Sequence, residues 1–123
     1  MAVKHTIEYD LTPTSTSAGL HWFTLTVRNV GTENLVGLVK LNSLDVYSID
    51  VYGTGNFVRD LKPGKEQAFP FQAQVNATGW VYISLDGWND AGIFHWESPR
   101  IRIRIDVASS DLQKGSGRVH GVV

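Results

Sequence analysis

The sequence predicts an all-β protein in which about seven antiparallel strands form a two-layer sandwich. Apolar and polar residues alternate along most of the chain, which is the pattern of strands that bury one face. Short segments rich in Gly, Pro, Asn and Asp separate the alternating runs. No window of eleven or more residues has the spacing of an amphipathic helix. A closed β-barrel is the alternative architecture.

The predicted strands follow one another along the chain. In the first clear run, Phe23, Leu25 and Val27 alternate with polar residues, and we expect these three side chains to face the core. Predicted strands cover residues 4–11, 23–29, 66–75, 79–86 and 101–107, and two further strands lie within 35–52. The predicted turns are residues 13–19, 29–31, 53–56, 62–64, 77–79 and 89–92.

The last part of the chain has a different composition. Residues 108–123 are polar, rich in Gly and Ser, and without a period. We therefore expect one domain over residues 1–107 and a flexible tail or linker over residues 108–123. A domain of this size buries enough surface to hold a core without disulfide bonds.

Charge and composition argue against several kinds of partner. The net charge is −1 and the basic residues are spread along the chain, so we expect no nucleic-acid partner. No apolar segment approaches the roughly 18 residues of a membrane span, so we expect no membrane insertion. The N-terminus lacks the apolar region of a signal peptide, so the chain is either cytoplasmic or a piece of a longer cell-surface or extracellular protein.

Catalytic motifs are absent from the sequence, and we expect a protein that is not an enzyme. The four histidines are far apart, and none belongs to an HxxxH or HxH pair that would bind a metal from one element. The chain has no cysteine, no GxSxG elbow and no GxGxxG phosphate loop. We expect no cofactor. A small hydrolase with paired carboxylates is kept as a remote alternative.

Two turn motifs and the strands beside them carry a resemblance to a known family. The motif residues are Val27, Asn29, Gly31 and Thr32, then Leu61, Pro63 and Gly64, and then Gly79 at the start of the next strand. Over residues 20–107 this pattern resembles the CARDB type ("cell adhesion related domain found in bacteria") of immunoglobulin-like domain in bacterial and archaeal surface proteins. The resemblance implies a seven-stranded sandwich that acts in adhesion or as a spacer, with no catalytic residues.

The two turns also have the chemistry that tight turns need. Asn29 and Gly31 suit a turn with positive φ. Pro63 and Gly64 suit the two central positions of a type II turn.

The stretch SLDGWNDAGIFHWESP, residues 84–99, is the most distinctive feature of the sequence. We expect a hairpin that pairs Trp88 with Phe94, Asp86 with Trp96, Tyr82 with Arg100 and Trp80 with Arg102, and a shift by two residues would keep the same faces. The candidate binding residues on the outer face are Trp80, Tyr82, Trp88, Phe94, Trp96, Arg100 and Arg102. They form either a solvated surface, on which arginine stems cover the rings, or a patch that binds something.

A calcium site is a further reading of the same stretch. Its ligands would be Asp86, Asn89 and Asp90. Strand parity argues against a larger site, because Asp86 is expected to point outward and Glu97 inward. A bulge at Pro99 would reverse that register.

Taken together, these features favour a non-catalytic interaction, adhesion or spacer module of a prokaryotic surface or exported protein. Its expected partner is another protein, a neighbouring domain or a second copy of the chain. The alternative is a carbohydrate-binding module that stacks sugars on Trp80, Trp88 and Trp96.

Overall fold

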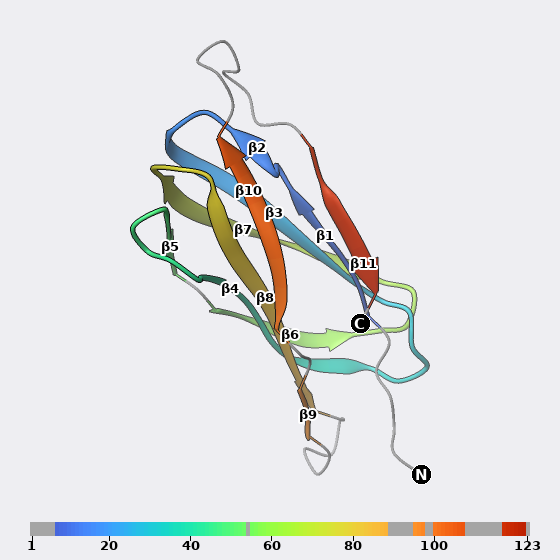
Figure 1. Cartoon of the computed structure of the whole chain (residues 1–123). Coiled ribbons are helices and arrows are strands. Elements are labelled where there is room, and N and C mark those ends of the chain that lie inside the picture. The colour runs from blue at the N-terminus through green and yellow to red at the C-terminus, as the bar shows by residue number, and fades with distance from the viewer. Residues whose placement is uncertain (1–6, 54, 89–94, 98–99, 108–116, 123) are drawn as a thin grey trace.

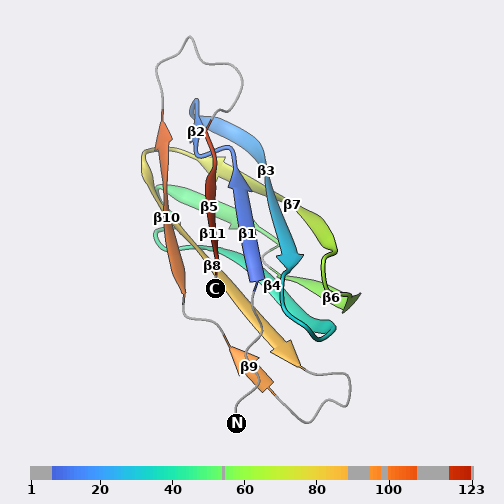
Figure 2. The same ribbon diagram turned by 90° about the vertical axis from the view of Figure 1, so that its right-hand side faces the viewer.

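The chain folds into two β-sheets that face each other, as the two views of a computed structural model show (Figure 1, Figure 2). The structure describes residues 7–53, 55–88, 95–97, 100–107 and 117–122, and for residues 57, 59, 88 and 95–97 it describes the backbone alone. No helix occurs within these ranges. They therefore hold no helix that is long and apolar enough to cross a membrane.

The strands divide between a five-stranded and a six-stranded sheet. Their bounds are β1 (Ile7–Thr12), β2 (Ser15–Thr16), β3 (Gly19–Asn29), β4 (Leu35–Ser43), β5 (Ile49–Tyr52), β6 (Gly55–Leu61), β7 (Glu66–Val75), β8 (Gly79–Trp88), β9 (His95–Glu97), β10 (Ile101–Val107) and β11 (Val119–Val122). The five-stranded sheet has the order β11-β1-β3-β7-β5, and the six-stranded sheet has the order β2-β10-β8-β4-β6, with β9 paired to β8. The all-β prediction is confirmed.

The core lies between the two sheets and forms a single cluster of buried residues. Its largest fully buried side chains are Phe23, Phe71, Ile7, Leu11, Leu25, Leu41, Ile49, Ile83, Leu85, Ile105, Val27 and Val39. The alternation therefore predicted the inward residues correctly in the strands that were expected. Only Ile101 and Val107, at the two ends of β10, are partly buried. Burial of such side chains contributes roughly 1.5–3 kcal/mol each, before the entropy of ordering the chain is subtracted.

One pair of strands is parallel, which corrects the expectation of purely antiparallel sheets. The chain leaves the five-stranded sheet after β1 and enters the six-stranded sheet as β2. There Ser15 pairs with Asp106 and Thr16 with Val107, in the parallel direction of β10. The predicted turn over residues 13–19 therefore contains a crossing between the sheets as well as a turn.

Strand β6 was not predicted, because an irregularity breaks its alternation. Leu35 pairs with Leu61 and Gly37 pairs with Val58, so β6 has one more residue than β4 between these two pairs. Such a bulge lets Val58 and Leu61 both face the core although they are three positions apart. Asp60, inside the bulge, has a φ of 50°.

The end of the chain also differs from the prediction. Val119–Val122 form β11, which pairs with β1 in the five-stranded sheet, so the expectation of a flexible tail is wrong for these residues. Residues 108–116 lie outside the described ranges. Strand β11 covers the edge of β1, which would otherwise present unpaired backbone groups to other chains. A four-residue strand with a Gly in it has too short a pattern to be recognised in sequence.

Asn29 connects three parts of the fold through its hydrogen bonds. Its buried side chain donates to the carbonyl oxygens of Glu33 (2.7 Å) and Leu61 (2.8 Å), and its Oδ1 accepts from the Gly31 amide (3.0 Å). Its backbone exchanges hydrogen bonds with the turn at Gly64 and Lys65.

Only one of the two predicted turn geometries is present. Gly64 has a φ of 82° and the Lys65 amide bonds the Lys62 carbonyl, as the predicted type II turn requires. Asn29 and Gly31 have no positive φ, so that expectation is wrong. The Asn side chain is needed at position 29 because it has both a donor and an acceptor in one buried place.

We predict that Asn29→Ala lowers the free energy of unfolding by roughly 2–4 kcal/mol, because it leaves the carbonyls of Glu33 and Leu61 without their donor. Chemical denaturation measures this change. The matched control is Asn76→Ala, which removes exposed hydrogen bonds to Gln74 and to the Tyr47 carbonyl and should cost less than about 1 kcal/mol. Equal effects of the two substitutions would contradict the role of Asn29.

We predict that Gly121→Ala weakens the attachment of β11 by about 1–3 kcal/mol, because an added Cβ would overlap the ring of Tyr9 on the paired strand. Hydrogen exchange should then become faster at the amides of β1 and β11 and stay slow in β7. The matched control is Gly55→Ala, where an added Cβ meets nothing within 4 Å. Unchanged exchange in β11 of Gly121→Ala would show that this strand does not depend on the close approach.

Candidate functional site

The outer face of β8 and β10 is the first candidate site. Tyr82 lies opposite Arg102, and Trp80 lies opposite Arg104. This register is shifted by two residues from the expected pairing of Tyr82 with Arg100, so the same side chains still face outward. We call the set Trp80, Tyr82, Arg100, Arg102 and Arg104 the aromatic-arginine face.

Two guanidinium groups of this face stack on two aromatic rings. The Cζ of Arg100 lies 4.9 Å from the centroid of the Tyr82 ring, and the Cζ of Arg102 lies 5.6 Å from that of Trp80. The register makes each contact diagonal, since each ring is stacked by the arginine two positions before its direct partner. At exposed sites such a contact contributes about 0.5–1 kcal/mol. The stacks therefore orient the arginines without removing them from solvent.

Two acidic side chains beside this face are already paired. Asp86 binds Lys40 of β4, with an Nζ–Oδ2 distance of 3.3 Å, and Asp106 binds Arg104, with an Nε–Oδ1 distance of 2.8 Å. Within the described residues, Arg100 and Arg102 have no ion-pair partner. Both arginines are exposed. Lys40 was not among the predicted residues, because its strand had an uncertain register in the sequence.

The tip of the hairpin has a different register from the one expected. Asp86 pairs with Glu97, Gly87 with Trp96 and Trp88 with His95. The expected pairs Asp86–Trp96 and Trp88–Phe94 are therefore wrong. The expectation that Asp86 and Glu97 lie at positions on opposite faces of the sheet is also wrong, because these two residues are direct partners. The register changes by one residue between Glu97 and Ile101, the segment that contains Pro99.

Three of the predicted aromatic residues are not placed on the aromatic-arginine face by the structure. The backbones of Trp88 and Trp96 belong to β8 and β9, while their side chains lie outside the described parts of the chain. Phe94 lies wholly outside them. Their part in binding remains a prediction.

The calcium hypothesis rests on one described residue. Asp86 is 14% exposed at its side chain, its Oδ2 binds Lys40, and its Oδ1 is buried with no hydrogen-bond partner in the described part of the chain. Asn89 and Asp90 lie outside the described residues. Among the residues that are described, no group of three or more His, Asp or Glu side chains could hold a metal ion. Calcium binding stays a prediction.

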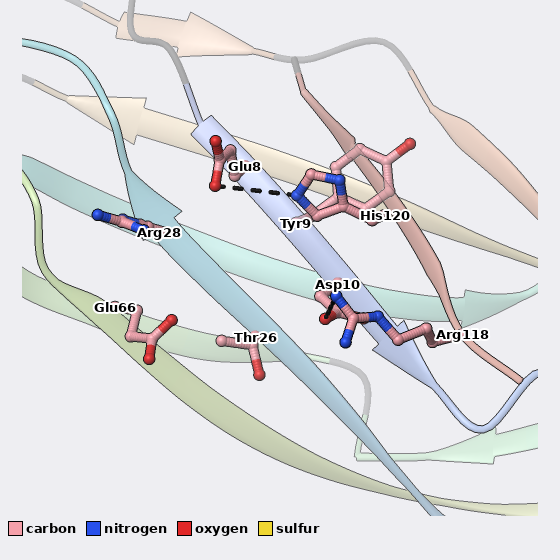
Figure 3. Close-up of a pocket in the computed structure, with 8 residues that line it drawn as sticks. All are labelled: Glu8, Tyr9, Asp10, Thr26, Arg28, Glu66, Arg118 and His120. Atoms are coloured by element: carbon pink, nitrogen blue, oxygen red, sulfur yellow. Dashed lines mark ion pairs between the residues drawn. The ribbon is translucent and has the colours of Figure 1, made fainter. Parts of the chain in front are cut away.

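A charged hollow on the outer side of the five-stranded sheet is the second candidate (Figure 3). Its volume is about 160 Å³, and its lining residues are Glu8, Tyr9, Asp10, Thr26, Arg28, Glu66, Arg118 and His120. Asp10 of β1 forms an ion pair of 3.3 Å with Arg118, which directly precedes β11, and Glu8 of β1 lies 3.8 Å from His120 of β11, a contact that is ionic when His120 is protonated (Figure 3). The Asp10–Arg118 pair and the Glu8–His120 contact join β1 to the last segment of the chain, and such cross-strand pairs help to hold β11 against β1.

Sequence reasoning did not single out Trp22 and Tyr52, two aromatic side chains that are exposed on the outer face of the five-stranded sheet. Trp22 precedes Phe23 in β3, and the expected strand began one residue too late to include it. Extension of the same alternation by one residue would have placed Trp22 on the outer face. The signal was therefore present in the sequence.

No protein-family model matches the chain, and no curated protein matches it. Function must therefore be argued from the chemistry of the outward residues on the two sheets.

Proposed function

We propose that the chain is a non-catalytic interaction module with an immunoglobulin-like sandwich, and that its aromatic-arginine face binds an acidic surface of a partner protein. The order of the strands supports the immunoglobulin-like part of this proposal. In that fold, strands A, B, E and D form one sheet and strands C, F and G form the other. The orders β1-β3-β7-β5 and β10-β8-β4 correspond to A-B-E-D and G-F-C, in the same sequence along the chain.

The remaining strands are additions to that plan. Strand β6 lies beside β4, follows β5 in the chain, and widens the six-stranded sheet. Strand β11 widens the other sheet beyond β1. Strands β2 and β9 pair with β10 and β8 in the six-stranded sheet itself. All four additions therefore extend the two sheets, and none of these strands lies over the outer face of β8 and β10.

The observation that carries the proposal is the pair of arginine-aromatic stacks. Trp, Tyr and Arg are the residues most enriched in the energetically important parts of protein interfaces. Here Trp80 and Tyr82 of β8 lie beside the arginines of β10, and Trp80 is 44% exposed. The two guanidinium groups lie 4.9 and 5.6 Å from the ring centroids, and both arginines are exposed, so they are placed to bind carboxylates in two-point contacts.

The charge of the face selects an acidic partner. Asp86 and Asp106 are neutralised by Lys40 and Arg104, which leaves Arg100 and Arg102 uncompensated within the described residues. Carboxylates on a partner would neutralise these positive charges and would also raise the rate constant of association. A neighbouring domain or a second copy of the chain is an alternative occupant of the same face.

The setting of the module in an exported or cell-surface protein is part of the proposal. Its support is the resemblance of residues 20–107 to CARDB-type domains, in which such sandwiches serve adhesion or spacing. A carbohydrate-binding role for Trp80, Trp88 and Trp96 is less favoured, because Arg102 already stacks on the ring of Trp80. A sugar would have to displace that guanidinium.

Selection of a displayed random peptide library on the protein tests the proposal. We expect the selected peptides to be enriched in Asp and Glu, and their binding to weaken as salt rises because the attraction is screened. Arg102→Glu should lower their affinity about tenfold or more. The matched control is Arg28→Glu, an exposed arginine on the other sheet, which should leave the affinity unchanged.

Two results would count against the acidic partner. Selected peptides without an excess of acidic residues would contradict the charge argument, as would an equal loss in Arg102→Glu and Arg28→Glu. Sedimentation tests the alternative occupant, since self-association that disappears in Arg102→Glu would identify a second copy as the partner.

A further inference from the structure

The outer face of the five-stranded sheet carries a second aromatic surface, far from the aromatic-arginine face. Trp22 of β3 lies opposite Gln72 of β7, and Gln72 lies opposite Tyr52 of β5. These three side chains form one row across three neighbouring strands, which we call the Trp22 row. Trp22 is 62% exposed and Tyr52 is 47% exposed.

The adjacent row along the strands extends the same surface. Leu20 lies opposite Gln74, and Gln74 lies opposite Asp50. Leu20 is 53% exposed, and the amide of Gln74 donates a hydrogen bond of 3.3 Å to Asn76. Two amide side chains thus stand beside the apolar side chains of this surface. The Trp22 row itself contains no charged group.

The aromatic rings of this surface differ from those of the opposite sheet in whether a guanidinium group stacks on them. Tyr82 and Trp80 are each stacked by a guanidinium. Within the described residues, no cation stacks on Trp22 or Tyr52. With exposed fractions of 62% and 47%, Trp22 and Tyr52 are accessible to a ligand without the displacement of a described guanidinium.

Open aromatic rings beside amide side chains suit a neutral, hydroxyl-rich ligand. The C–H face of a sugar packs on an aromatic ring through apolar contact, and its hydroxyl groups exchange hydrogen bonds with amides, which both donate and accept. A charged ligand would find no counter-charge in the Trp22 row. An apolar protein surface would leave the amides of Gln72 and Gln74 unsatisfied if it buried them.

We infer that the Trp22 row is a binding platform for a neutral oligosaccharide. Trp22 and Tyr52 stand two strand spacings apart, roughly 10 Å, which is room for sugars in succession across the sheet. The two rings stack on sugars near the ends of the platform, and Gln72 binds hydroxyl groups between them. This site is separate from the aromatic-arginine face and does not depend on the function proposed for it.

Titration with neutral oligosaccharides, from disaccharides to hexasaccharides of glucose, xylose, mannose and N-acetylglucosamine, tests the inference. Isothermal calorimetry and the intrinsic fluorescence of tryptophan report binding. We expect at least one series to bind more tightly as its length increases. Trp22→Ala should weaken that binding about tenfold or more, and Gln72→Ala should weaken it to a smaller degree.

Val122→Ala is the matched control, because it removes a similarly exposed apolar side chain, 59% against 62% exposed, from β11 at the far edge of the same sheet. It should leave oligosaccharide binding unchanged. Since Trp22 is exposed, Trp22→Ala should keep the melting temperature of the parent protein, which shows that a loss of binding is not a loss of fold.

Three outcomes would overturn the inference. The first is no binding by any of the neutral series, and the second is equal binding by Trp22→Ala and the parent protein. The third is self-association, measured by sedimentation, that disappears in Trp22→Ala without any sugar binding, because it would make the Trp22 row a protein interface. Acidic peptide binding to the aromatic-arginine face would survive each of these results.

Discussion

Burial of every second residue between the two sheets is the constraint on which the rest of this structure depends. In β3, Phe23, Leu25 and Val27 are buried, and the residues between them face solvent. The same holds along β7 and β8. A slip of one residue in any strand would move its whole apolar set into water, so the register is strongly fixed. The outward residues are fixed with it, and they include every described residue to which we assign binding.

That constraint explains which parts of the structure were predictable from sequence. Strands with unbroken alternation, such as β7 and β10, were expected with their inward residues, and the turn at Pro63 and Gly64 was expected with its geometry. The prediction failed where the alternation is interrupted. Strand β6 has a bulge at Asp60, and β9 has a register that differs by one residue from that of β10. Neither irregularity has a reliable signature in one sequence.

Two further failures concern contacts between distant parts of the chain. Strand β11 exists because β1 offers an unpaired edge and Gly121 fits under Tyr9, a complementarity that local composition does not reveal. Asn29 resembled a turn residue, yet its role is to satisfy carbonyls at Leu61 and Glu33. For the candidate site, the pattern predicted the outward direction of Trp80 and Tyr82. The expected partners Tyr82 and Arg100, and Trp80 and Arg102, do stack, but as diagonal contacts, because the register is shifted by two residues from the one expected.

The two outer faces carry similar aromatic residues with different neighbours, and the neighbours decide the chemistry. On β8 and β10 the rings lie under arginines, so the surface presents oriented positive charge. On β3, β7 and β5 the rings flank glutamine, so the surface presents apolar area and neutral hydrogen-bonding groups. A sandwich can hold both surfaces because its core is filled by the residues that point the other way.

Cross-strand nuclear Overhauser effects in the labelled protein test this arrangement most directly. The structure predicts backbone proton contacts between Tyr82 and Arg102, and between Trp22 and Gln72, together with contacts from the Trp80 ring to the side chain of Arg102. A register slipped by one residue, with Tyr82 opposite Ile101 or Ile103, would contradict it, because the aromatic rings and the arginines would then belong to opposite faces.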